Sequence, residues 1–294
     1  MITEVSWRGN VTASNLHIAQ AAVDQSPLID PQLAEALRSP ASQFAVALEA
    51  TGTPPARFWR NLVPLAAQTS NRRQLIETAV TKTMGRGVRF ATTVSHLIER
   101  LVAIDEAIAG ALPNHAEDLE HRQRPLREQW EARGPGLLLQ IGNLTDPALL
   151  PAHCEALVVY PALGGGGEAH LEYNSVRIEG VLANPVAALP EVVRLAWLIA
   201  QLQLDLPKYG EQVNAQRLPH VARFAMLPPV LAAAETVELV RFTPELVDAA
   251  ISAWRLTTPA GVDAAAPVYE WWLTYQESRP PWPIALTALD QMLG

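Results

Sequence analysis

Proline is the residue that most constrains how this chain can fold. The sequence holds 24 prolines in 294 residues, a share well above the ~5% of an average protein. Proline has a fixed φ and no amide hydrogen, so it is tolerated at the start of a helix but disrupts the interior of one. Many elements of this chain are therefore expected to begin at a proline.

Residues 11–150 predict a series of helices. Asp30-Pro31 places a capping side chain directly before a proline, which favours a helix over residues 32–38. Further helical segments are expected to begin at three later points, namely Pro40, Pro54-Pro55 and Ser70-Asn71.

The spacing of apolar residues within 87–112 is typical of an amphipathic helix. Residues 114–133 are highly charged and predict an exposed helix that is bent or interrupted at Pro125. Gly134-Pro135-Gly136 follows, and we take it as the boundary between a helical region, 1–133, and a second region, 134–294.

The second region is expected to combine a small sheet with helices. Residues 156–163 are apolar and predict a buried strand, and residues 170–183 are rich in side chains that favour extended structure. Leu189-Pro190-Glu191 then begins a strongly apolar helix that runs to about residue 204. The whole chain is thus predicted to be mainly α (α+β), a multi-helix protein with a small central sheet over 154–183.

Four consecutive glycines, Gly164 to Gly167, suggest a phosphate-binding loop at first sight. Such a loop leads directly into a helix and carries a lysine. Here the glycines are followed by Glu168 and a strand-like segment without lysine. The preferred interpretation is a flexible loop between two strands that binds no nucleotide.

His170 and Glu172 are two residues apart, so on a strand they would share a face with Asn174. A histidine beside a carboxylate can exchange a proton or bind a metal. A solvated polar face of an edge strand has the same pattern and is the preferred interpretation, because two ligands do not make a metal site.

The densest group of possible ligands lies near the start of the charged segment, at His115, Glu117, Asp118, Glu120 and His121. Its last two residues match the end of the inverted zinc motif His-x-x-Glu-His, but Glu117 stands where the first histidine belongs. A solvated helix face is again the preferred interpretation.

Composition excludes several classes of protein. Hydrophobic residues make up 49% of the chain and charged residues 18%, which allows a substantial core. The net charge of −8 argues against a nucleic-acid partner, although local arginine-rich patches remain compatible with it. The single cysteine, Cys154, excludes disulfides within the chain and a cysteine-based zinc site. No apolar run reaches the ~18 residues of a membrane span and no signal sequence is visible, so a cytoplasmic protein without cofactor or metal is expected.

An aromatic group lies near the end of the chain, at Tyr269, Trp271, Trp272, Tyr275 and Trp282. Such a group can stack on a sugar or a base. At helical spacing it more often attaches a terminal helix to the body of the protein, and this is the preferred interpretation.

The segment NSVRIEGVLANP from Asn174, followed by LPEVVRLAWLIAQ from Leu189, resembles the core of the zincin metallopeptidases. In that family a sheet strand leads through a loop into a long apolar helix that carries His-Glu-x-x-His. The matching positions here are Trp197, Leu198 and Gln201, which supply neither metal ligand nor base. The resemblance covers about thirty residues and implies a zincin-like scaffold without its metal, that is, a pseudo-peptidase.

The helix of that segment is informative without the resemblance. It is apolar around nearly its whole circumference, which predicts that other elements cover it on all sides. Glu191 and Arg194 are three residues apart and are expected to form an ion pair in its first turn. Trp197 is expected to be among the most buried tryptophans.

The expected function is that of a non-enzymatic binding or assembly protein whose ligand the sequence does not identify. A protein partner and a second copy of the chain are both compatible with it. The alternative is a hydrolase whose acidic and histidine residues converge only in the fold. Its candidate residues are His115, Glu120, His121, His170 and Glu172. A small-molecule binder that uses the tryptophans is a third possibility.

Overall fold

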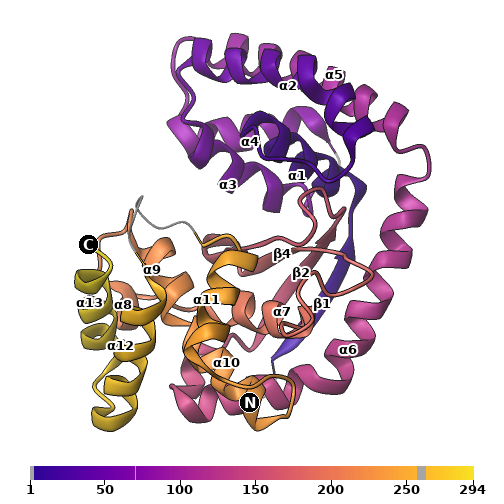
Figure 1. Ribbon diagram of the computed structural model, residues 1–294. Coiled ribbons are helices and arrows are strands. Elements are labelled where there is room, and N and C mark those ends of the chain that lie inside the picture. The colour runs from indigo at the N-terminus through magenta and orange to yellow at the C-terminus, as the bar shows by residue number, and fades with distance from the viewer. Residues whose placement is uncertain (1–2, 70, 257–262) are drawn as a thin grey trace.

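The computed structural model describes residues 3–69, 71–256 and 263–294. It confirms a mainly helical α+β protein with one small mixed sheet (Figure 1). The first group of helices is α1 (Val11–Val23), α2 (Pro31–Thr51), α3 (Pro55–Leu65), α4 (Arg72–Met84), α5 (Phe90–Ala111) and α6 (His115–Leu144). The second group is α7 (Glu191–Ala200), α8 (Pro207–Gly210), α9 (Leu218–Ala225), α10 (Leu227–Thr236), α11 (Pro244–Ala253), α12 (Ala265–Ser278) and α13 (Trp282–Met292).

The sheet has four strands in the order β1-β2-β4-β3. They are β1 (Glu4–Gly9), β2 (His153–Val159), β3 (Gly167–His170) and β4 (Ser175–Glu179). The first three in this order are parallel, and β3 pairs antiparallel with β4 at the edge. Short 3-10 turns lie beside it, η1 (Pro147–Leu149) and η2 (Leu171–Tyr173). The strands were expected only in the middle of the chain, and β1 corrects this prediction.

Helices surround the sheet. α7 packs on β3 and β4, α1 packs on β2, and α6 contacts both β1 and β2. All five residues of β4 are buried, including the charged Arg177 and Glu179. In a strand that is covered on both faces, a charged side chain is tolerated only where it forms ion pairs or hydrogen bonds.

Local sequence explains most helix starts. The Asp30 carboxylate accepts the amide hydrogens of Gln32 and Leu33, which caps α2 as predicted. Proline at the first helical position likewise begins α3, and the Asn71 side chain caps α4. Pro40 corrects the prediction of a new start, because it lies inside α2.

The predicted boundary at residues 134–136 is not a linker. α6 continues through Gly134 and Pro135 to Leu144, and it also contains Pro125. Trp130, on the preceding turn, packs so closely on Gly134 that any Cβ there would lie 2.4 Å from the indole ring. Glycine is therefore required here by packing and not by chain flexibility. In Figure 1, α6 follows one side of the molecule from the first helices to α10.

The buried apolar side chains of the described residues form two cores. One is built mainly from α1 to α5 and includes Tyr160 and Ala162 from the segment after β2. The other joins the sheet, α6 and the helices from α7 onward. The core of the first five helices therefore extends beyond the predicted region 1–133, because Tyr160 and Ala162 are part of it.

The central helix is α7, and every one of its residues is buried. The predicted burial of Trp197 is confirmed, with 2% of the residue exposed. Its indole N–H donates to the carbonyl oxygen of Arg223 at 2.8 Å, and its ring lies 4.9 Å from that of Trp254. The expected ion pair between Glu191 and Arg194 is also present at 3.4 Å.

The aromatic group near the end of the chain serves packing. Trp271, Trp272, Tyr275 and Trp282 are buried, and their rings stack or tilt against one another between α12 and α13. The Trp271 N–H donates to the carbonyl of Ala285 at 2.9 Å. The prediction that these residues attach terminal helices to the body is confirmed for these four.

Candidate functional site

A pocket of about 220 Å³ lies beside the edge strand β3. We call it the β3 pocket. Its walls come from α3, from β3 and η2, from the segment after α7, and from α9. The polar side chains that line it are those of Arg60, Glu168, His170, Glu172, Tyr173, Gln201, Asp205 and Arg223. These residues are far apart in the sequence, so the pocket depends on the whole fold.

The structure brings two predicted site residues, His170 and Glu172, to this pocket. It does not place them on one face of a strand. His170 is the last residue of β3, Glu172 lies in the turn η2, and Asn174 adopts a left-handed conformation with φ of 47°. The expected polar strand face is therefore wrong, because the chain turns after His170.

His170 is the most unusual side chain of the pocket. It is 2% exposed, and neither ring nitrogen has a hydrogen-bond partner among the described residues. Burial lowers its pKa to about 4, so the ring is neutral at pH 7 and offers one donor and one acceptor. A buried polar group that is left unpaired costs about 1–3 kcal/mol. Such a side chain is ready to bind a polar group that enters the pocket.

A buried ion-pair network supports the floor of the pocket. Glu168 accepts from Arg177 at 2.7 Å and lies 3.7 Å from Arg223. Burial alone would raise the pKa of Glu168, but the guanidinium groups of Arg177 and Arg223 outweigh it and lower that pKa to about 2. Arg177 also donates to the amide oxygen of Gln20 at 2.8 Å. The network fixes β3 to β4 and to α1.

The loop over Gly164 to Gly167, which we call the glycine loop, lies against a second buried carboxylate, that of Glu179. Glu179 accepts from His17 Nε2 at 2.6 Å, from the amide of Leu163 at 2.8 Å and from that of Gly165 at 2.6 Å. Although burial opposes it, the bond from His17 helps to lower the pKa of Glu179, so its carboxylate stays charged. The loop thus binds a carboxylate of its own chain.

The glycines connect β2 to β3, as predicted, and two of them are closely packed. Gly165 has φ of 120°, and a Cβ there would lie 2.8 Å from Pro185 and 2.9 Å from the Arg194 guanidinium. A Cβ on Gly167 would lie 2.6 Å from Leu198. Glycine is used here because other groups approach the backbone closely. That the loop binds no nucleotide stays a prediction.

Strand β3 has a free edge facing the pocket. Gly166 accepts the amide hydrogen of Glu179, and Glu168 and His170 follow in the same alternating register. In an antiparallel pair the residues between them direct their N–H and C=O groups outward. Ala169, which lines the pocket, therefore presents its backbone to the edge that no described strand covers.

The other predicted residues lie elsewhere. His115 is buried and its Nε2 lies 2.9 Å from Ser14 Oγ, with the ring packed edge-on against Tyr160. This side chain connects α6 to α1, and burial lowers its pKa. Of the remaining members of its group, only Asp118 is near enough to influence its charge.

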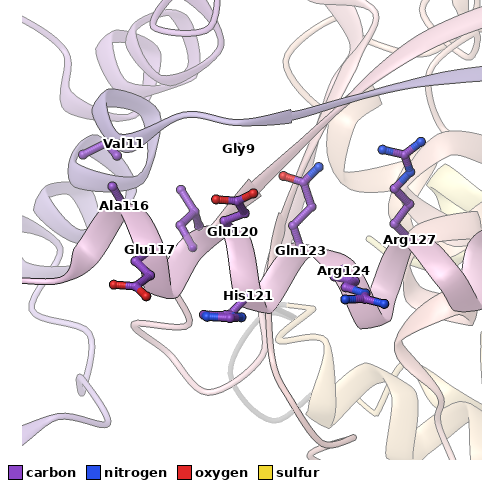
Figure 2. A pocket seen from close by; sticks show the side chains of 10 residues that line it. Gly9, Val11, Ala116, Glu117, Glu120, His121, Gln123, Arg124 and Arg127 are labelled. Atoms are coloured by element: carbon purple, nitrogen blue, oxygen red, sulfur yellow. The ribbon is translucent and has the colours of Figure 1, made fainter.

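Glu120 and His121 line a wider, shallow hollow of about 710 Å³ along α6. Figure 2 shows that Glu120 points to the side of α6 facing Gly9, whereas His121 points to the opposite side. Successive residues on a helix diverge in this way. The structure does not bring these two side chains together.

Metal and thiol chemistry find little support in the described residues. Within those ranges, no three side chains of His, Cys, Asp or Glu are close enough to share a metal ion. Burial raises the pKa of the Cys154 thiol to about 12, so it is not a nucleophile at neutral pH. None of the described helices combines the length and apolarity needed to cross a membrane.

Comparison of the chain with models of protein families, with curated proteins and with solved structures found no match.

Of the eight polar side chains that line the β3 pocket, the sequence predicts two as site residues, His170 and Glu172. Arg60 lies on α3 and Arg223 on α9, far from His170 in the sequence, so no local pattern links them to it. In the sequence, Glu168 serves only as evidence against a phosphate-binding loop. Gln201 is the clearest signal, because it is a polar residue directly after the mostly apolar helix α7.

Proposed function

We propose that this chain is a non-enzymatic binding protein whose β3 pocket holds part of an extended peptide. The observation that carries the proposal is His170, a buried side chain beside a strand edge whose two nitrogens have no partner among the described residues. A peptide can supply hydrogen-bond partners both to the imidazole of His170 and to the free edge of β3. Its backbone can pair with Ala169, and a carbonyl, amide or side chain can satisfy the imidazole.

The size of the pocket supports a ligand that is only partly enclosed. At about 220 Å³ it is smaller than the ~300–1,000 Å³ common for pockets of drug-sized ligands. One or two side chains of a longer chain suit this volume. The rest of the peptide would then lie outside the pocket, along the edge of the sheet.

A zincin-like scaffold without its metal is part of this proposal. β4 leads through residues 180–190 into the apolar helix α7, which is the order of elements on which the resemblance rests. At the three positions of the metal motif, Trp197 packs on Trp254, Leu198 lies against Gly167, and Gln201 donates to the Trp197 carbonyl. These residues build a core, which favours a pseudo-peptidase.

Peptide hydrolysis is the alternative, and His170 with Glu172 is the pair on which it would depend. An effective general base has a pKa near the working pH, and the pKa of His170 is about 4. This difference favours binding over catalysis.

The test is the binding of peptides and its dependence on the strand edge. An array of unstructured decapeptides identifies ligands, and fluorescence anisotropy measures the affinity of the strongest one. Ala169→Pro removes the outward amide hydrogen at a position where an edge strand tolerates proline. We expect it to weaken binding at least tenfold, whereas Ala169→Ser, which keeps the amide, should bind as the original chain does.

His170 provides the second arm. His170→Phe removes both nitrogens and should also weaken binding about tenfold, whereas His170→Gln keeps a donor and an acceptor and should retain most of the affinity. Equal binding by all four variants would contradict the proposal. Cleavage of the same peptides by the original chain, or one tightly held metal ion per chain, would favour the hydrolase.

A further inference from the structure

Positive charge is concentrated in one part of the sequence. Residues 50–98 hold seven of the 22 lysines and arginines but only one of the 30 acidic residues. Their formal net charge is therefore +6, in a chain whose net charge is −8. These residues form α3, α4 and the beginning of α5, together with the connecting loops.

Most of these cations have no carboxylate partner in the part of the chain that the structure describes. Arg72 pairs with Asp105, and Arg73 pairs with Glu77. Each of the other five is exposed and has no carboxylate within ion-pair distance in the described ranges. We call these five residues the basic surface: Arg57, Arg60, Lys82, Arg86 and Arg89. A charged group that is left unpaired on a surface is available to a ligand of opposite charge.

The basic surface adjoins the β3 pocket. Arg60 itself lines the pocket, as does Tyr173. The Lys82 ammonium lies 4.8 Å from the centre of the Tyr173 ring, and the Tyr173 hydroxyl donates to Asn61 on α3 at 2.7 Å. A ligand that leaves the pocket beside Tyr173 therefore meets α3 and the end of α4 first.

We propose that the peptide bound by the β3 pocket is an acidic segment of a partner protein, whose carboxylates lie on the basic surface. The inference rests on the proposed function, since it assumes a peptide in the pocket. Glu172 and Asp205 also line the pocket and carry negative charge. They repel carboxylates from their own wall, so the acidic side chains of the ligand are directed toward Arg60 and Lys82.

A nucleic acid fits these features less well. Outside residues 50–98 the formal net charge of the chain is −14, which repels a long polyanion wherever it leaves the basic surface. Single strands also bind by stacking on exposed aromatic rings. Phe58 and Trp59, the aromatic residues of α3, are buried in the core.

The experiment compares three labelled decapeptides in which alanine alternates with glutamate, glutamine or lysine. The glutamate peptide should bind at least tenfold more tightly than the other two, and raising the salt from about 50 to 300 mM should weaken it several-fold. Arg57→Glu with Arg60→Glu should reduce its affinity at least tenfold. Thermal unfolding of the double variant confirms that it remains folded.

Arg124→Glu with Arg127→Glu is the matched control. These two arginines are also exposed, three residues apart on a helix, and the change in net charge is identical. This variant should bind the glutamate peptide as the original chain does.

The outcomes separate the two proposals. If the glutamate and glutamine peptides bind equally, and Arg57→Glu with Arg60→Glu has no effect, the acidic ligand is refuted and strand addition survives. If the glutamate peptide depends on the two arginines but Ala169→Pro has no effect, the basic surface stands and strand addition fails. A twenty-nucleotide single strand that binds more tightly than the glutamate peptide at about 150 mM salt would overturn the inference.

Discussion

Glu191 and Arg194 form an ion pair in which both side chains are almost fully buried, at 6% and 2% exposure. Removing two charges from water costs several kcal/mol per ion, and their attraction offsets this only when further hydrogen bonds complete the pair. Here the Glu191 oxygens and the Arg194 Nε and Nη1 have no hydrogen-bond partner among the described residues. The buried charges of this pair are therefore expected to lower the free energy of unfolding of the folded chain.

The titration of Glu191 gives the first prediction. Burial raises its pKa from an ordinary value of 4.5 to about 7, in spite of Arg194. Between these two values the folded chain binds more protons than the unfolded chain, so the free energy of unfolding falls as the pH rises. We expect the original chain to lose about 2–3 kcal/mol relative to Glu191→Gln between pH 5 and pH 8. Urea unfolding of both proteins across this range measures it, and parallel curves would contradict it.

Trp197 gives the second prediction. Its side chain is buried against Trp254 and donates to a backbone carbonyl of α9, so Trp197→Ala leaves a cavity and an unpaired oxygen. Loss of a large buried aromatic costs about 3–5 kcal/mol. Leu139→Ala on α6, where the leucine is 59% exposed, is the control and should change the free energy of unfolding little. A Trp197→Ala protein of undiminished stability would refute the central position of α7.

At the scale of elements, the glycine loop connects β2 to β3 and packs against two charged side chains, those of Glu179 and Arg194. Gly165→Ala should destabilise the fold by at least about 2 kcal/mol, because φ is 120° and the new methyl group would meet Pro185 and Arg194. Gly87→Ala is the control, since a Cβ there meets nothing within 4 Å. Denaturant unfolding measures both, and equal effects would show that the loop can move away.

The elements also show what could be predicted from sequence. Helix starts depend on a few neighbouring residues, so Asp30-Pro31 and Asn71 correctly predict the starts of α2 and α4. The predictions at Pro40 and Gly134 are wrong, because the roles of these residues depend on packing from other parts of the chain. The sequence predicts only a small part of the β3 pocket for the same reason. His170 and Glu172 are neighbours in sequence, whereas Arg60 and Arg223 reach them only through tertiary structure.

At the scale of the whole molecule, α6 joins the two cores without a break. Arg133 lies in the middle of this helix, near the buried Trp130 and Leu137. Trypsin needs a locally unfolded segment, so cleavage after Arg133 should be slow in the native protein. Cleavage after Arg86 or Arg89, in the exposed loop between α4 and α5, should come first. Mass spectrometry of a limited digest checks this order, and early cleavage after Arg133 would restore the predicted boundary.

The position of β1 in the sheet has a consequence for biosynthesis. Val5 pairs with Cys154, so β1 leaves the ribosome about 150 residues before the strand that it pairs with. At ~5–20 residues per second, this strand waits several seconds to half a minute with its amide groups unpaired. During that time α1 to α5 can collapse around their own apolar side chains, but the sheet cannot begin. We therefore expect nascent chains stalled before residue 153 to be the species that chaperones bind.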